Sequence, residues 1–249
     1  MEKSVQKRRL LMAGMTESLS NERHQVIIFV MLSFVMAGFA EAVYLTAPQL
    51  FQAYFGTANP LLMVVILALL GTALSVYFLS SGRFELFNGE KHNLRGLVPY
   101  FGLAVLLAVL MITVDSIFMF PESISVLFPQ SVLFYPVMGF VAEIVFHLIP
   151  LSLVLIISTL FSGKVDFSKI FWPSILIISA LEPIFQIWDL FGYFPPWAAA
   201  YVGIHIYVIN IIGLSLFKRR DFLSMYSFRL VYYLFWHIAW GYLRLGILF

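Results

Sequence analysis

The chain of 249 residues contains no cysteine, which excludes disulfide bonds, thiolate metal sites and cysteine nucleophiles. Charge is also scarce, because Asp, Glu, Lys and Arg make up only 11% of the residues, against roughly 25% in a typical soluble domain. Hydrophobic residues account for 61%. A chain this apolar is predicted to lie mostly inside a lipid bilayer, which is its first expected partner.

The sequence also lacks the common motifs of several enzyme classes. It contains no His-Glu-x-x-His, no Gly-x-Ser-x-Gly and no glycine-rich phosphate loop. It has no basic stretch suited to nucleic acid, so no nucleic-acid partner is expected. Any chemistry must therefore come from polar residues inside the apolar runs.

Seven apolar runs approach or exceed the ~20 residues that a helix needs to cross the hydrocarbon core. The sequence therefore predicts an all-α fold, a polytopic integral membrane helical bundle with about seven transmembrane helices. Residues 1–24 are predicted to form a cytoplasmic basic N-terminal arm, and residues 25–249 a single transmembrane domain. The predicted spans are 25–45, 61–81, 97–120, 131–162, 170–192, 197–217 and 226–249.

The distribution of positive charge predicts the orientation of these spans. Of the 15 Lys and Arg residues, 13 lie in the N-terminal arm or in the segments after the second, fourth and sixth spans. The intervening loops 46–60, 121–130 and 193–196 carry none. Because positive loops stay in the cytoplasm, the N-terminus is predicted to be cytoplasmic and the C-terminus external in this multi-pass protein.

Two ionisable residues lie deep in the fourth predicted span. Glu143 and His147 are four residues apart, so they share one helical face, and both are costly in hydrocarbon unless paired, protonated or facing water. Pro136 and Pro150 flank them, which predicts a kinked, tilted or broken helix. Such a break favours a cavity beside Glu143 and His147.

A second polar face lies in the fifth span, where Glu182 is expected at the same depth as Glu143. Gln186 shares its face, and Pro183 weakens the backbone hydrogen bonding there. Two buried carboxylates at one depth repel each other unless one is protonated or a cation or histidine lies between them. The sequence therefore predicts either that one of the two carboxyl groups is protonated or that a cation or histidine lies between Glu143 and Glu182.

The seventh span holds His237 near its middle. Arg229 is expected to reach the cytoplasmic surface, while Arg244 lies at the outer end, where Asp189 is a possible partner. Asp115 lies at the outer end of the third span and is expected to reach water. Both arginines are thus interpreted as structural or orienting residues.

Glu143, His147, Glu182 and His237 come from three spans at similar depth, which leaves four interpretations open. A carboxylate can activate water for hydrolysis within the membrane. The four residues suit a divalent metal such as zinc. They also suit a proton relay in a small transporter. Finally, they can form a polar network that only fixes helix packing.

Three stretches, together with their order and spacing, resemble the motifs of the CPBP family, which includes type II CAAX prenyl endopeptidases and bacteriocin-processing proteins. Ala142 to His147 resembles the first motif, Glu-Glu-x-x-x-Arg. Ile178 to Gln186 resembles the region of the second, Phe-x-x-x-His. Lys218 to Gly241 resembles the third, His-x-x-x-Asn or Asp, with His237 at its start. The glutamate that activates water in the family corresponds to Ala142 here. The arginine of the first motif corresponds to His147, the histidine of the second motif to Gln186, and the final Asn or Asp of the third motif to Gly241.

The resemblance implies a CAAX-type intramembrane endopeptidase that needs no cofactor. Glu143 is then the base, His147 and His237 assist the oxyanion or the proton transfer, and Glu182 and Gln186 line the pocket. The implied partner is a membrane-associated or prenylated peptide substrate. The departures from the motifs keep a second expectation open, a non-catalytic scaffold or binding relative.

Overall fold

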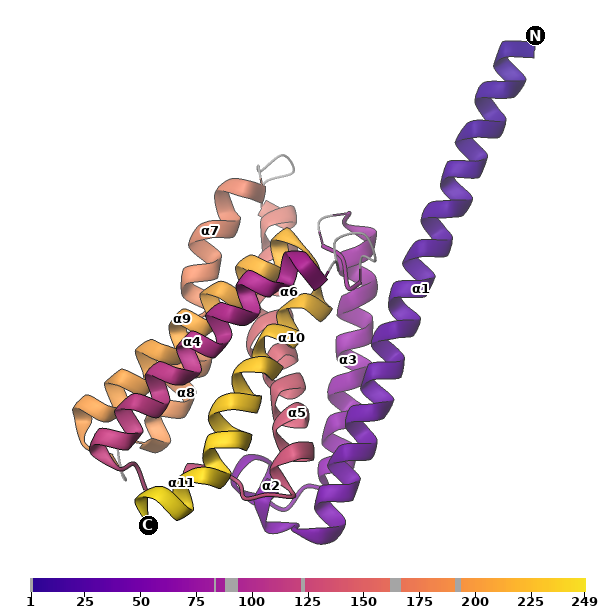
Figure 1. The fold of residues 1–249 in the computed structure, drawn as a ribbon. Coiled ribbons are helices and arrows are strands. Elements are labelled where there is room, and N and C mark those ends of the chain that lie inside the picture. The colour runs from indigo at the N-terminus through magenta and orange to yellow at the C-terminus, as the bar shows by residue number, and fades with distance from the viewer. Residues whose placement is uncertain (1, 83, 88–93, 122–123, 162–166, 191–193) are drawn as a thin grey trace.

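A computed structural model describes most of the chain and shows that it is helical (Figure 1). Among the described residues there is no strand, which confirms the predicted all-α class. The backbone is described except at residues 1, 83, 88–93, 122–123, 162–166 and 191–193. Side chains are additionally not described at residues 2–21, 53, 159, 161, 167–168 and 189–190.

Six helical stretches in the described part of the chain are long and apolar enough to cross a membrane. They match the first six predicted spans closely, because each is a continuous apolar run whose backbone groups must be satisfied within the helix. These stretches make the protein a multi-pass membrane protein. They are Glu22–Thr46, Pro60–Ser80, Leu94–Phe118, Ser131–Ser158, Lys169–Trp188 and Pro196–Arg219.

The helices that form these stretches pack into one bundle, and one short helix joins the first two of them. The first helix, α1 (Glu2–Thr46), lies beside α3 (Pro60–Ser80), and α2 (Gln49–Phe55) connects the two. The third stretch is α4 (Leu94–Phe118), and the sixth is α9 (Pro196–Arg219). The backbone of α1 continues through residue 24, so the predicted boundary of the arm is not visible as a break.

The fifth stretch consists of α7 (Phe167–Ile178) and α8 (Leu181–Leu190), separated by a turn. Helix α8 packs against α9. The C-terminal segment is α10 (Phe222–Tyr233), η3 (Leu234–Trp240) and α11 (Gly241–Leu248). It corresponds to the seventh predicted span, but its many tyrosine and tryptophan residues and its histidine make it less apolar than the six stretches above.

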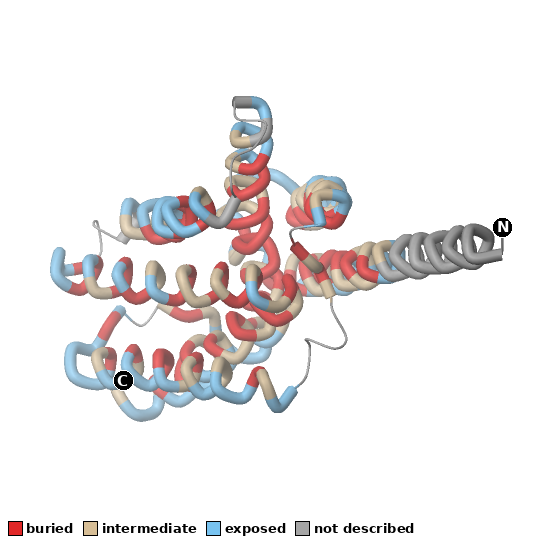
Figure 2. The backbone as a smooth tube through the Cα atoms, turned by 90° about the horizontal axis from the view of Figure 1, so that it is seen from above, coloured by how far each residue is buried: buried red, intermediate tan, exposed pale blue. Residues whose placement is uncertain are grey.

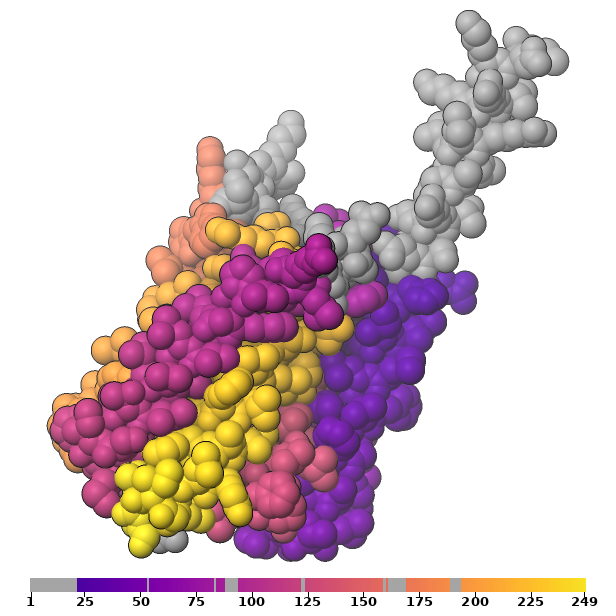
Figure 3. All heavy atoms as spheres, viewed as in Figure 1, coloured from indigo at the N-terminus to yellow at the C-terminus, as the bar shows by residue number. Residues whose placement is uncertain are grey.

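Helix α10 occupies the centre of the bundle and packs against α4, α5 and α9 (Figure 1). Viewed from above, the buried residues line the surfaces where the helices face one another (Figure 2). Figure 3 shows the C-terminal segment lying along α4 on one face of the molecule, with α1 on the other side of it. Polar side chains of α10 are therefore surrounded by other helices.

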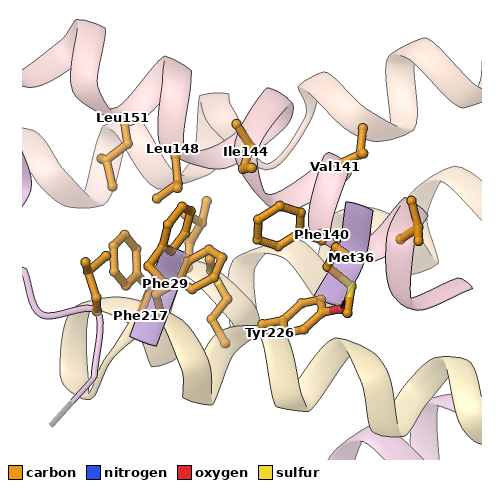
Figure 4. Close-up of a cluster of buried hydrophobic side chains, with 14 of the residues drawn as sticks. Phe29, Met36, Phe140, Val141, Ile144, Leu148, Leu151, Phe217 and Tyr226 are labelled. Carbon is orange, nitrogen blue, oxygen red and sulfur yellow. Dashed lines mark hydrogen bonds between the residues drawn. The ribbon is translucent and has the colours of Figure 1, made fainter. Parts of the chain in front are cut away.

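The predicted break in the fourth span is a change of helix type. The α-helix α5 (Ser131–Ala142) continues into a π-helix, η2 (Glu143–Leu148), and then into α6 (Ile149–Phe161). One face of this region carries Ile144 and Leu148, which join a buried apolar cluster with Phe29 of α1 and Phe217 of α9 (Figure 4). Ile144 and Leu148 thus hold η2 against the apolar cluster, while Glu143 and His147 of the same helix contact polar groups. Such π-helical turns occur frequently at functional sites.

Candidate functional site

The site is centred on Arg229 of α10, a residue that is only 3% exposed. Its Nε–H donates to Glu143 Oε1 at 2.6 Å. Nη1 and Nη2 each donate to one oxygen of Glu182, both at 2.9 Å. The remaining two N–H groups donate to the Tyr233 hydroxyl at 3.2 Å and to Asn210 Oδ1 at 3.0 Å. A guanidinium has five N–H donors, so every donor of Arg229 is in use.

Close contact between α5 and α10 brings Arg229 within reach of Glu143. A Cβ atom added to Gly139 would lie 3.1 Å from the Tyr233 ring and 3.4 Å from Arg229 Cδ. Gly139 precedes Glu143 by about one helical turn, so the glycine allows the arginine side chain to pass close to α5. The second oxygen of Glu143, Oε2, contacts His147 Nδ1 within η2. His147 Nε2 is buried and has no hydrogen-bond partner among the described residues.

The other carboxylate, Glu182, lies in the first turn of α8, just after the turn that separates α7 from α8. Its Oε1 accepts a further hydrogen bond from Gln186 Nε2 at 3.0 Å. Asn210 of α9 links this turn to Arg229, because its Nδ2 donates to the Ser179 carbonyl at 3.2 Å. Three elements, η2, α8 and α9, are thus joined through a single arginine.

A cavity of about 330 Å³ lies next to this network. Glu182, Gln186 and Arg229 line it on the polar side, together with the hydroxyl-bearing Tyr232 and Tyr233. Most of the remaining lining is apolar or aromatic. Ala142, not Glu143, faces the cavity from the end of α5. The cavity is therefore largely apolar, with one polar end.

His237 also lines this cavity, from the π-helix η3. Its ring stacks on Tyr135, with the ring centroids 4.2 Å apart and an interplanar angle of 17°. Its Nδ1 is buried and has no hydrogen-bond partner among the described residues. His237 makes no described hydrogen bond to Glu143, His147 or Glu182, so the structure places it apart from the ion network. Of the predicted residues, His147 alone directly contacts Glu143.

The interpretation of Arg229 as a surface-reaching residue is wrong. Helix α10 begins at Phe222, four residues before the predicted start of the span, so Arg229 lies two turns inside the helix and not at its end. Its burial at the centre of the network follows from that depth. The signal that could have identified it was the repulsion between the two carboxylates, because a cation between them was one of the solutions that the sequence left open.

The interpretation of Asp115 also needs correction. Asp115 is fully buried and does not reach water. Arg244 Nε and Nη2 donate to its two oxygens at 2.7 and 2.9 Å, and Trp240 Nε1 donates to Oδ2 at 2.6 Å. The side chain of Asp189, the partner considered from the sequence, lies outside the described residues. Asp115 therefore links the end of α4 to the C-terminal segment and does not lie at the membrane–water interface as expected.

His205, the remaining histidine of the spans, packs between aromatic rings. Its ring centroid lies 5.9 Å from that of Tyr201 and 5.6 Å from that of Tyr232. It does not line the cavity.

The four residues considered as metal ligands do not form a ligand set. In the part of the chain that the structure describes, no three His, Asp or Glu side chains converge as metal ligands would. Arg229 occupies the space between the carboxylates of Glu143 and Glu182, where a metal ion would have to bind. The residues present therefore do not fit a divalent metal.

Comparisons of this chain with protein-family models, with curated proteins and with solved structures gave no match. The features of the described residues that bear on function are therefore the cavity and its polar network.

Proposed function

We propose that this protein is a membrane-embedded binding protein for a small, largely apolar molecule. The observation that carries the proposal is the cavity of about 330 Å³ beside a network whose carboxylates are already hydrogen-bonded. Cavities that hold small molecules are typically ~300–1,000 Å³ and mostly apolar, with a few polar groups that orient the ligand. This corresponds to the non-catalytic binding relative expected from the sequence.

The hydrogen bonding of the carboxylates argues for binding over catalysis. Both oxygens of Glu143 are engaged, one by Arg229 and one by His147, and Glu143 does not line the cavity. A general base must lie within hydrogen-bond reach of the water that it activates. At the position that aligns with the family's water activator, the cavity is lined by Ala142, which has no ionisable group.

Binding can be tested by equilibrium dialysis of neopentylbenzene, a small uncharged aromatic hydrocarbon, against the protein in phosphatidylcholine nanodiscs. Empty nanodiscs correct for partition into lipid. Val202 lines the cavity, so Val202→Trp is expected to fill part of it and to weaken binding at least tenfold. Ile204 on the same helix is 65% exposed, so Ile204→Trp is the matched control and should leave binding unchanged. Absence of saturable binding to the wild-type protein, or equal effects of the two variants, would contradict the proposal.

Intramembrane peptidase activity is a second candidate, favoured by His237. This histidine lines the cavity with an unpartnered Nδ1, and it matches a motif residue of the family that the sequence resembles. A fluorogenic transmembrane or prenylated peptide reconstituted with the protein tests this function. Cleavage that disappears in both Glu143→Gln and His237→Gln would support the peptidase. No cleavage by the wild-type protein, together with saturable ligand binding, is the result expected from the binding proposal.

A further inference from the structure

The ion network beside the cavity contains one negative charge too many. Glu143 and Glu182 contribute two carboxylates, and Arg229 contributes one cation. Within the described part of the chain, His147 is the only other basic group in direct contact with these three residues, and it balances the count only when it holds a proton. An uncompensated charge in the membrane interior is costly. The network therefore favours either an additional proton or an additional cation.

Arg229 cannot serve an anionic ligand in this arrangement. All five of its N–H donors are bonded to protein acceptors, so an anion would have to break one of these bonds. Glu182, in contrast, keeps acceptor capacity. It accepts three hydrogen bonds, from Arg229 twice and from Gln186, while a carboxylate offers about four acceptor positions. The polar end of the cavity is therefore suited to a positive ligand group.

The rest of the lining favours the same charge. Eight of the residues around the cavity are Phe, Tyr or Trp, contributed by α2, α5, η2, α8, α10 and η3. The faces of such rings attract organic cations, and most strongly where water is excluded. A carboxylate at one end of an aromatic cavity provides both the charge and the apolar contacts that an alkylammonium group requires.

We propose that the cavity binds an organic cation, and that this cation replaces a proton otherwise held by the Glu143–His147 pair. The inference rests on the proposed binding function and specifies the class of ligand. When the cation binds, the displaced proton passes to bulk water, and the total charge of the network and its ligand stays constant. No covalent bond forms or breaks apart from the one to this proton.

The groups that surround the Glu143–His147 pair restrict which residues can hold the proton. Helix α6, which continues from η2, carries no acid, base or tyrosine, and α3, which packs against η2, carries only Tyr77. Tyrosines remain protonated between pH 5 and 8, so they do not change the count there. Among the described residues, the titratable and charged groups that contact the network or line the cavity beside it are Tyr54 on α2, Tyr135 on α5, Glu182 on α8, Tyr226, Arg229, Tyr232 and Tyr233 on α10, and His237 on η3, while His205 on α9 contacts Tyr232.

The experiment compares two probes of the same shape by dialysis against the nanodiscs described above. Benzyltrimethylammonium carries a fixed positive charge, and neopentylbenzene is its uncharged carbon isostere. At pH 8 the wild-type protein is expected to bind the cation at least tenfold more tightly. Lowering the pH from 8 to 5 should weaken cation binding at least tenfold and leave the isostere unaffected. Because the quaternary ammonium does not titrate, such a pH dependence belongs to the protein.

The decisive variant is Glu143→Gln, which keeps an acceptor for Arg229 but removes the surplus charge. It should reduce cation affinity at least tenfold without changing binding of the isostere. Glu41→Gln, the same substitution on α1 away from the cavity lining, should change neither.

Four outcomes overturn the inference. If the isostere binds as tightly as the cation, or if Glu143→Gln weakens both probes equally, the charge does not select the ligand, and the binding function alone stands. If cation binding is independent of pH, the cation does not replace a proton of the Glu143–His147 pair. If neither probe binds to the wild-type protein, the proposed binding function fails together with the inference.

Discussion

Two buried arginines lie on the same C-terminal helical segment, and their surroundings differ. Arg244 faces one carboxylate, Asp115, and also donates to the carbonyls of Phe120 and Pro121. Arg229 faces two carboxylates, an amide and a phenol, and it lines a cavity. Among the described residues, the formal charge of Arg244 is balanced by Asp115, whereas the charge around Arg229 is balanced only when His147 is protonated.

The difference separates a structural ion pair from a responsive one. Asp115 accepts hydrogen bonds from Trp240 and from the backbone N–H of Phe120 as well as from Arg244. Its carboxylate oxygens are therefore engaged by protein donors and not by a ligand. It joins the end of α4 to α11. The Arg229 network instead has a spare charge, a histidine with one unpartnered nitrogen and an adjacent cavity. Burial alone does not distinguish a functional arginine from a structural one. The charge balance and the neighbouring space do.

The largest effect is expected when Arg229 is removed. Arg229→Met leaves two carboxylates buried without their cation, and removing one partner of a buried ion pair costs about 3–5 kcal/mol. The free energy of unfolding, measured by SDS titration in mixed micelles, should fall by at least this amount. Adding Glu143→Gln and Glu182→Gln removes both negative charges and should restore most of the loss. If the triple variant is no more stable than the single one, the charge account of this network is wrong.

A smaller loss is expected when Arg244 is removed. In Arg244→Met, Asp115 keeps two of its donors, Trp240 Nε1 and the Phe120 N–H, so the cost should lie near the lower limit, about 3 kcal/mol. Binding of neopentylbenzene to the folded fraction should stay unchanged, because Arg244 does not line the cavity. A destabilisation equal to that of Arg229→Met, accompanied by lost binding, would remove the distinction between the two arginines.

Asn210 provides an intermediate case. Asn210→Ala leaves one N–H of Arg229 and the Ser179 carbonyl without their partners, and unsatisfied buried groups cost about 1–3 kcal/mol. The same titration should show a loss of this size. Ser152→Ala is the control, because its hydroxyl bonds only within its own helix turn. Equal stability of the two variants would indicate that the link from α9 to the α7–α8 turn contributes little.

The smallest effect is expected at Gln186. Gln186→Leu removes one hydrogen bond to Glu182, worth about 1 kcal/mol, and leaves both contacts between Glu182 and Arg229 in place. The unfolding free energy should change by no more than this. Because Gln186 lines the cavity at its polar end, binding of benzyltrimethylammonium should respond more than stability does. A loss of several kcal/mol would mean that Gln186 supports the ion network itself.

Several features of the site were predictable from the sequence because they depend on nearby residues. Glu143 and His147 are four positions apart, and a helical backbone brings such residues together even through a π-helical turn. The same spacing joins Glu182 to Gln186. The expectation that one carboxyl group is protonated, or that a cation or histidine lies between the two, follows from electrostatic repulsion alone. Arg229 was not identified as that cation, because the predicted start of the last span placed it at the membrane surface.

The sequence by itself determined the all-α class and the approximate limits of the six apolar helices. These depend on runs of apolar residues, and in lipid every backbone polar group within such a run must be bonded inside the helix. The tertiary structure alone decided which carboxylate pairs with which arginine, and that Ala142 faces the cavity while Glu143 does not. These ion pairs join residues 47 to 129 positions apart in the sequence, so they depend on how each helix is rotated about its axis and on how closely the helices approach one another. Those are set by the packing of side chains such as Ile144, Leu148 and Phe217 around Gly139 and α10.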